Sequence, residues 1–385
     1  MTMVIVKECE SYDVNQIMNQ INGGIEALGG WSQFVKPLDR VLLKVNLIGP
    51  KPPESASLTH FDFVRAIVRI LRSLECEVWI GDSSGGAIAG IAPTAQAFQV
   101  SGLEQMAKEE GAQIKNFDKE GVVEVPRTSH PGETMFLAKP LFDADVVINL
   151  PKFKTHSMGI YTGAVKNVFG CLPGLRKAKY HRDSPAPEEF GAILADVHQA
   201  LLISLHIMDG VVAMQGEGPT AGDPYPAKKI LISKDPMALD TVAMSLIGLQ
   251  PDEVPILSAA IEQGIGTSKM EEIKIHAEPD SLLPLDSFHL PKRYYSTKKQ
   301  NYGSLIRVID FLKTRPEVNQ KKCVNCNMCV DSCPVGAIDR ETKKIDYDAC
   351  IECLCCHELC RYEAVELKRK NLMARVMMKF YRGDH

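Results

Sequence analysis

The 385-residue chain lacks several features that would assign a protein to a class at once. No apolar run approaches the roughly 18 residues that a membrane-spanning helix needs, so we expect no integral membrane segment. The opening residues, MTMVIVKE, lack the charged start and apolar core of a secretory signal. A net charge of −4 gives no reason to expect a nucleic-acid partner. Neither G-x-G-x-x-G nor G-x-x-x-x-G-K-S/T occurs, so the usual dinucleotide and nucleoside-triphosphate sites are unsupported.

Cysteine is scarce over most of the chain, where only Cys9, Cys76 and Cys171 occur. The other nine of the twelve cysteines crowd into the last sixth. Eight of these nine form two runs with the spacing C-x2-C-x2-C-x3-C, and Pro334 follows the first run while Arg361 follows the second. The two runs are Cys323, Cys326, Cys329 and Cys333, and then Cys350, Cys353, Cys356 and Cys360.

This repeated spacing is typical of bacterial ferredoxins with two 4Fe–4S clusters, in which the fourth cysteine of each run ligates the other run's cluster. Three thiolates at intervals of three residues, on a tight loop, can point at three corners of one cluster. The fourth ligand must then come from elsewhere. The predicted ligand sets are Cys323, Cys326, Cys329 and Cys360 for cluster 1, and Cys350, Cys353, Cys356 and Cys333 for cluster 2.

Other uses of these thiols fit the pattern less well. Two zinc sites are the alternative. A structural zinc site usually takes two C-x2-C pairs as its four tetrahedral ligands, so it has no use for the third cysteine that each run places at the same interval. A disulfide framework is disfavoured by the absence of a secretory signal, and the thiols together indicate a reducing cytoplasm. Cys355, between two predicted ligands, is expected to be a small buried residue; an extra ligand or a redox-sensitive thiol is the other interpretation.

Short apolar runs alternate with helical patterns over roughly the first 250 residues, which predicts an α/β fold with a mostly parallel sheet and helices on both faces. The predicted strands are Arg40–Leu47, Cys76–Asp82, Ala112–Phe117, Asp145–Leu150, Ser204–Asp209 and Lys228–Ser233. The predicted helices are His60–Leu74, with Thr59 as its cap, Leu103–Glu110, Glu188–Leu202 and Pro236–Ile247.

Four segments are predicted along the chain. Residues 1–290 form the α/β domain, and 291–317 form a linker with a helix (Ser304–Lys313). Residues 318–368 form a small α+β module for two clusters, and 369–385 form a tail. The stretch 279–302 has no sustained periodicity and is expected to be a linker or a surface strap. The tail, 369–385, carries an amphipathic stripe at Leu372, Val376 and Phe380, which we expect to pack on the protein rather than on a membrane surface.

Polar side chains gather where the predicted strands end, which is where parallel sheets bind ligands. A surplus of lysines there favours a carboxylate or phosphate ligand. A helix within Thr162–Leu172 would add free backbone N–H groups for an anion. The alternatives without a ligand are solvated lysines and aspartates (Asp82, Asp209 and Asp235) that cap helices or turns. His60, His156 and His181 could together bind a metal ion, but nothing in their separation requires it. The predicted anion crevice comprises Lys44, Asn46, Lys152, Lys154, Lys166, Asn167 and Asp209, with Asp82 or His156 as proton donor.

The segments KVNL, GDSSGG, NLPKFKTH, TGAVKNVFGCLPGLRKAKYH, DGVVAMQGEGPTAGDP and KDPMALD resemble the domain of unknown function 362 (DUF362) family over roughly residues 4–290. Members of that prokaryotic family often carry a two-cluster ferredoxin module. The tail separately resembles bacterial 2×4Fe–4S ferredoxins, from which it departs at Arg361 and Cys355. The resemblance implies an iron–sulfur protein and supplies neither a substrate nor catalytic residues.

Two functional hypotheses follow. In the first, the chain is an electron-transfer protein whose two 4Fe–4S clusters exchange electrons with a redox partner protein or with the α/β domain. In the second, it is a ferredoxin-coupled oxidoreductase that reduces an anionic small molecule in the crevice. Clusters that serve only as structural staples are the least favoured interpretation. The sequence leaves open whether a flavin or another anionic ligand is bound.

Overall fold

The computed structural model describes residues 2–85, 93–174, 177, 180, 187–298, 314–331, 333, 335–350, 355–358, 360, 362 and 364–369. Several predictions fall outside this part of the chain. They concern the helix at 304–313, the tail at 370–385, His181, Cys353 and Arg361, and the side chain of Cys355.

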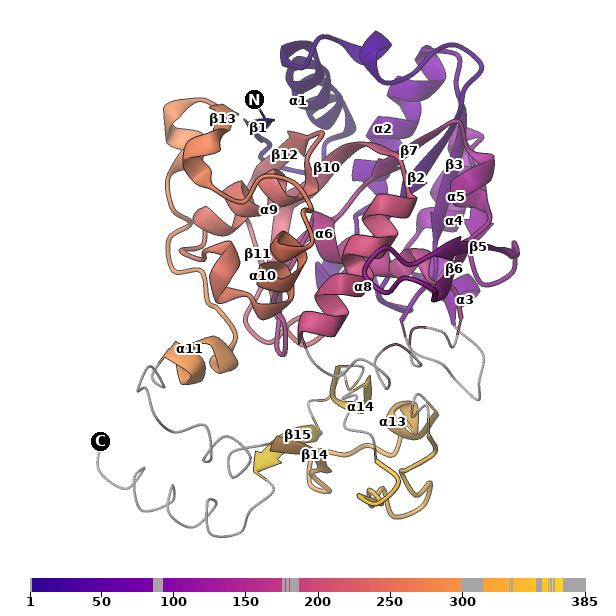
Figure 1. Ribbon diagram of the computed structural model, residues 1–385, viewed down its shortest axis with the longest axis vertical. Helices are drawn as coiled ribbons and strands as arrows, with labels where there is room; N and C mark the ends of the chain where they lie inside the picture. The colour runs from indigo at the N-terminus through magenta and orange to yellow at the C-terminus, as the bar shows by residue number, and fades with distance from the viewer. Residues whose placement is uncertain are drawn as a thin grey trace.

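One large sheet organises the α/β domain (Figure 1). Its main path has the order β13-β1-β12-β10-β7-β2-β3-β4. Strand β12 runs antiparallel to both of its neighbours, and the other neighbours on this path are parallel, so the predicted mostly parallel sheet is confirmed. The strands are β1 (Thr2–Glu8), β2 (Arg40–Lys44), β3 (Glu77–Asp82), β4 (Gln113–Asn116), β7 (Val146–Asn149), β10 (Ile203–Gln215), β12 (Lys229–Ser233) and β13 (Ile273–His276).

Strand β10 is long enough to pair with two strands in succession on the same side. Its first part pairs with β7, and its second part pairs with β8 (Lys152–His156), with Asp209 opposite Lys152 and Met214 opposite Lys154. The segment that we expected to be a polar strand end is therefore itself a strand. Three shorter pairings complete the domain's strands, involving β9 (Ile160–Thr162), β11 (Asp223–Tyr225), and a separate hairpin of β5 (Val122–Pro126) and β6 (Thr134–Ala138).

Helices cover both faces of the sheet, and each face has its own apolar core. In α2, Phe63, Ile67 and Leu71 recur every four residues, so they form one buried stripe against the sheet. The helices on that face are α1 (Val14–Ala27), α2 (Phe61–Ser73), α3 (Thr94–Val100) and α4 (Leu103–Glu110). The opposite face carries α5 (Pro140–Asp143), α6 (Ala164–Asn167), α8 (Pro187–Ala200), α9 (Pro236–Ser245) and α10 (Pro255–Glu262).

Two local predictions are corrected. Thr59 does not cap α2, because its hydroxyl donates to the Leu150 carbonyl (2.7 Å), and His60 Nδ1 accepts from the Asp62 amide (3.2 Å) instead. The stretch 279–302, expected to be irregular, contains η6 (Pro279–Leu282) and α11 (Lys292–Lys298). The other short 3₁₀ turns are η1 (Trp31–Gln33), η2 (Pro53–Ser55), η3 (Val168–Cys171), η4 (Pro251–Glu253) and η5 (Met270–Glu272).

The C-terminal module is a small α+β unit built from a repeat of 27 residues. Its strands β14 (Thr314–Val318) and β15 (Val365–Arg369) pair antiparallel, with Val318 opposite Val365. The isolated bridge between Ile338 and Ile345 is the equivalent contact in the repeat. Ile345 lies 27 residues after Val318, and Ile338 lies 27 residues before Val365. Helix α14 (Cys355–Glu358) likewise lies one repeat after α13 (Met328–Asp331). The two halves of the module are therefore related by an approximate twofold symmetry.

Candidate functional site: a thiol-lined cavity and a buried polar crevice

The thiols predicted for cluster 1 line one cavity in the C-terminal module. Cys323, Cys326 and Cys329 come from the first run, whereas Cys360 is the fourth cysteine of the second run. The apolar core of the module packs behind these thiols, with Val318 and Val365 among its buried residues. The fold therefore brings a thiol from the second half of the repeat to the three from the first.

The environment of these thiols suits the cationic core of an iron–sulfur cluster. Burial, followed by the nearby Cys360, Cys323 and Cys326, raises the pKa of the Cys329 thiol to about 11. The metal-binding form is the thiolate, which such a site favours only when a cationic group sits among the sulfurs. Hard cations prefer oxygen ligands, so a four-thiol lining suits iron–sulfur or zinc chemistry.

Backbone amides donate to the fourth cysteine of each run in the same way. The Ala337 amide lies 3.2 Å from Cys333 Sγ, and the Ala364 amide lies 3.2 Å from Cys360 Sγ. These contacts are one repeat apart, and hydrogen bonds to ligand sulfurs help to set a cluster's potential. Of the cluster 2 thiols, Cys350 is half-buried and Cys356 is buried, and Cys353 lies outside the described residues.

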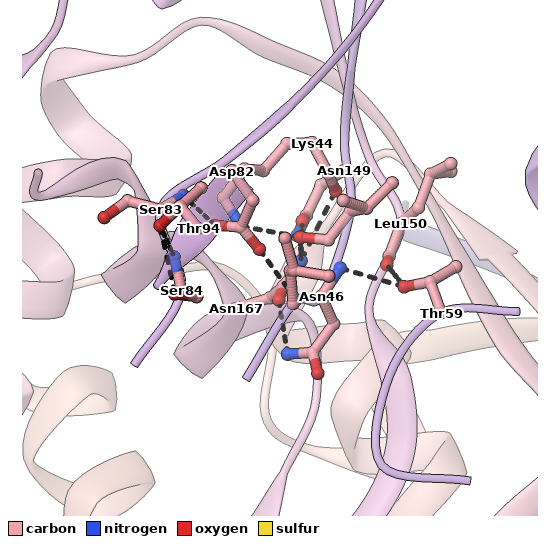
Figure 2. Close-up of polar contacts among 12 residues, drawn as sticks. Lys44, Asn46, Thr59, Asp82, Ser83, Ser84, Thr94, Asn149, Leu150 and Asn167 are labelled. Carbon is pink, nitrogen blue, oxygen red and sulfur yellow. Dashed lines mark hydrogen bonds and ion pairs between the residues drawn. The ribbon is translucent and has the colours of Figure 1, made fainter. Parts of the chain in front are cut away.

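A second polar site lies where the strands of the main sheet end. Lys44 at the end of β2 pairs with Asp82 at the end of β3, with 2.9 Å between Nζ and Oδ1 (Figure 2). Asp82 also accepts from the amides of Leu47 (2.8 Å) and Ser83 (2.7 Å). Burial raises the pKa of Asp82, against the opposing effect of Lys44 and Lys177. A raised pKa is the direction that a carboxyl proton donor requires.

Three asparagine side chains continue this site as a hydrogen-bonded row (Figure 2). Asn46 Nδ2 donates to Asn167 Oδ1 (2.8 Å), and Asn167 Nδ2 donates to Asn149 Oδ1 (2.7 Å). Asn149 Nδ2 in turn lies 3.0 Å from His206 Nδ1. Lys154 Nζ donates to Asn46 Oδ1 (2.7 Å), which joins β8 to the row. Asn46 and Lys154, predicted at two separate strand ends, thus meet in one network with Asn167.

Lys152 and Asp209 form a second buried ion pair, which includes a residue that the sequence did not reveal. The Lys152 ammonium lies 2.7 Å from Asp209 Oδ2 and 2.7 Å from the Tyr12 hydroxyl, which donates to Asp209 Oδ1 (3.0 Å). Burial lowers the pKa of Lys152 and raises that of Tyr12. Tyr12 precedes α1, in a segment with no pattern that would predict a role.

The expected anion site at the start of α6 is already filled by the protein itself. Asp240, on α9, accepts from the amides of Ala164 (2.7 Å) and Val165 (2.9 Å). The prediction that these N–H groups are free for an external anion is therefore wrong. Lys166, from the same segment, is half-buried.

His60 and His156, the two described histidines of the metal site considered above, make other contacts. His60 stacks on Tyr12, with ring centroids 3.7 Å apart, and His156 Nδ1 accepts from the amides of Met158 (3.3 Å) and Gly159 (3.1 Å). Within the described ranges, no group of three or more His, Cys, Asp or Glu side chains converges on a single metal ion, and in a 4Fe–4S cluster each of the four thiolates would bind a different iron. Asp235 caps α9, as the alternative without a ligand predicts.

Lys177 is a further buried cation that sequence reasoning passed over. Its ammonium donates to the Ser83 carbonyl, the Ser83 hydroxyl (2.9 Å) and the Ser84 carbonyl (3.0 Å). Burial lowers the pKa of Lys177 to about 8. Asp118 accepts from the hydroxyls of Ser83 (2.6 Å) and Thr94 (2.5 Å), so this end of β3 is cross-linked by hydrogen bonds.

These features define an α/β protein that carries an iron–sulfur module. The DUF362 family model (domain of unknown function) matches residues 41–245, and a 4Fe–4S binding domain model matches residues 316–339. The chain is 31% identical over 317 residues to the thylakoid-associated protein sll1697 of Synechocystis sp., which covers 77% of this chain and 94% of that protein. The chain belongs to the DUF362 family.

Two solved structures show weaker likeness. One is the lactate racemase apoprotein of Thermoanaerobacterium thermosaccharolyticum (11% identity, TM-score 0.34; 58% of this chain, 53% of that one). The other is a Thermotoga maritima protein (11% identity, TM-score 0.35; 57% and 55%). The chain spans little more than half the length of each. In the part of the chain that the structure describes, no helix is both long and apolar enough to cross a bilayer.

Proposed function

We propose that the protein is an electron carrier in which two 4Fe–4S clusters in the C-terminal module exchange electrons with a redox partner protein. The matched 4Fe–4S binding domain supports an iron–sulfur role. The second cluster, the two ligand sets and the partner are parts of the proposal. When bound, each cluster would accept and release one electron at a potential set by its surroundings.

One observation carries this proposal: Cys360 lines the same cavity as Cys323, Cys326 and Cys329. Two independent zinc knuckles would draw their ligands from within each run, whereas two-cluster ferredoxins exchange the fourth cysteine between runs. The equivalent amide contacts at Cys333 and Cys360 support a second site built like the first.

In this proposal, the chain's own residues hold the thiolates in place and limit the movement of surrounding atoms. The apolar side chains behind the sulfurs exclude water, and the Ala337 and Ala364 amides stabilise negative charge on sulfur. Cys326 is exposed, so it marks the edge of cluster 1 through which a partner would exchange electrons.

The test begins with protein purified without oxygen and reduced by dithionite. We expect the brown absorbance to bleach on reduction and to return when an oxidised redox protein, such as a cytochrome c, is added. Cys326→Ser should weaken the response, whereas Cys76→Ser, at a buried thiol of the α/β domain, should leave it unchanged. Colourless protein that binds zinc in place of iron would refute the proposal.

An oxidoreductase that binds an anion in the crevice is the second proposal, with Lys44, Asn46, Lys152, Lys154, Lys166, Asn167 and Asp209 as binding residues and Asp82 or His156 as proton donor. It has less support, because Lys44 and Lys152 already pair with the protein's own carboxylates. Anion-dependent thermal stabilisation that Lys152→Ala abolishes would favour it. Neither this oxidoreductase nor the electron carrier is proposed to bind a flavin.

We place the protein in a reducing, cytoplasmic compartment, because thiolate ligands and the free buried thiols Cys9, Cys76 and Cys171 suit such conditions. A relative is named as thylakoid-associated, so attachment to a membrane surface is the competing location. Fractionation of cells, with the protein followed by immunoblot in the supernatant and in the membrane pellet, distinguishes the two.

A further inference from the structure

A loop between the two halves of the C-terminal module buries a lysine. Only 3% of Lys343 is exposed, and its backbone has φ 57°, in the left-handed region. The Lys343 amide donates to the Asp339 carbonyl (2.9 Å), and the ammonium donates to the Arg340 carbonyl. Asp339 Oδ1 accepts from the Thr342 amide (2.7 Å), which tightens the turn. A buried cation is costly unless something nearby compensates its charge, so its location needs a reason.

Lys343 lines the same cavity as the four thiols predicted for cluster 1. The other described residues of that lining are apolar or neutral, apart from the thiols themselves. A cluster held by four thiolates is an anion, and it gains one further negative charge on reduction. Among the described residues of this lining, Lys343 is therefore the one that carries a formal charge opposite to that gain.

At the repeat position that matches Lys343, the described part of the chain has a proline instead of a lysine. The bridge Ile338–Ile345 and the pair Val318–Val365 are related by the 27-residue shift, so positions in the two halves can be matched directly. The backward shift that takes Ile345 to Val318 also takes Lys343 to Pro316, which lies on β14 and carries no charge. The repeat thus places a lysine beside one set of thiols and a proline at the matching position of the other.

Building on the electron-carrier function, we propose that Lys343 makes the two clusters unequal. Its charge stabilises the reduced form of the cluster held by Cys323, Cys326, Cys329 and Cys360, and so raises that cluster's potential above the potential of its companion. Net charge near a cluster is one of the factors that set its potential. Electrons entering the module would then rest on the cluster beside Lys343.

Two neighbouring groups provide the comparison for this effect. Asp339 also senses the Lys343 charge, but it is exposed, and water and salt screen exposed charges strongly. Lys344, the next residue, is exposed as well. Removing the charge of Lys344 changes the net charge of the chain by the same amount as removing that of Lys343, but from a position in water.

The test is a redox titration of the full chain, purified without oxygen and followed by EPR. We compare wild type with Lys343→Gln, Lys343→Met, Lys343→Arg and the control Lys344→Gln. Glutamine keeps a hydrogen-bond donor for the Arg340 carbonyl and removes the charge. The Lys343→Gln variant therefore tests the effect of the charge even if Lys343→Met assembles its clusters poorly. Arginine keeps the charge.

We expect two reduction steps in the wild type. Lys343→Gln should lower the step at the higher potential, by a shift equivalent to about a tenfold change in the reduction equilibrium (59 mV for one electron). The other step should not move, and Lys343→Arg and Lys344→Gln should both resemble the wild type. Unchanged steps in Lys343→Gln, equal shifts of both steps, or a shift of the lower step alone would overturn the inference. A wild type without clusters would instead refute the proposed function itself.

Discussion

Buried lysines contact different groups in the two regions of this molecule. In the α/β domain, Lys44 and Lys152 are almost completely buried, and each lies within 3 Å of its own carboxylate, Asp82 or Asp209. In the C-terminal module, Lys343 is buried beside a set of thiols, and its ammonium donates to a backbone carbonyl. In the first region these two lysines are already paired with carboxylates, whereas in the second the lysine lines a cavity whose thiolates would make a bound cluster anionic overall.

This difference teaches that a lysine at a strand end is weak evidence for an external anion. Lys44 and Lys152 satisfy the sequence pattern of a ligand site, but their partners come from other strands of the same sheet. If the pairs hold the domain together, breaking them should lower stability. The predictions below test that account, in order of the expected size of the effect.

The largest effect is expected from Asp209→Asn, which leaves the Lys152 ammonium buried without its carboxylate. Removing one partner of a buried ion pair costs about 3–5 kcal/mol, because the remaining charge is uncompensated. Urea unfolding at pH 7, followed by circular dichroism, measures the loss. The control is Glu104→Gln, which breaks an exposed pair with Lys108 and should cost less than about 0.5 kcal/mol. Equal costs for the two variants would contradict the account.

A medium effect is expected from Gly170→Ala, because a Cβ at position 170 would lie 2.2 Å from Asp82 Oδ1 and 2.7 Å from Lys44 Nζ. Overpacking of this kind costs about 1–3 kcal/mol. Gly23→Ala, in α1, meets no atom within 4 Å and should instead stabilise the protein by up to about 1 kcal/mol. Thermal unfolding of both variants checks the prediction, and a neutral Gly170→Ala would show that the ion pair can move away.

A smaller effect should appear in the pH dependence of stability. Burial raises the pKa of Asp240 from its ordinary value to about 7, so the folded protein binds this proton more tightly than the unfolded chain does. This group's contribution to stability is therefore largest at low pH and is lost as the pH rises through 7. Between pH 6 and pH 8, the loss should be of the order of 1 kcal/mol.

Asp240→Asn should remove that part of the slope. Unfolding free energies of wild type and variant are measured by urea titration at pH 6, 7 and 8. The gap between the two should change with pH in the direction that makes the wild type relatively more stable at pH 6. A constant gap would mean that Asp240 has the same charge in the folded protein throughout this range.

Much of the architecture could be predicted, because alternating apolar runs and helical stripes are local signals. Strand β3 begins within one residue of its predicted start, and α4 has its predicted bounds. Cysteine spacing was similarly local, and it indicated which thiols to look for around one cavity. Such patterns depend only on neighbours in the sequence.

The parts that sequence reasoning missed depend on contacts between distant segments. Tyr12 reaches Asp209 across 197 positions, and Asp240 reaches the Ala164 amide across 76. No local pattern marks Tyr12, and Asp240 ends the segment KDPMALD without anything there that indicates its contact with Ala164. The pairing of β8 with the second half of β10 is equally non-local, and it makes a strand of the residues predicted as the polar end of the preceding strand.

The central claim is that the fourth cysteine of each run serves the other run's cluster. EPR-monitored titration of Cys326→Ser, Cys333→Ser and Cys360→Ser, together with iron analysis of the wild type, tests it most directly. We predict about eight iron atoms per wild-type chain, with Cys326→Ser and Cys360→Ser altering the same reduction step and Cys333→Ser altering the other. If Cys326→Ser and Cys333→Ser alter the same step, or if the thiols bind zinc and no iron, the account is contradicted.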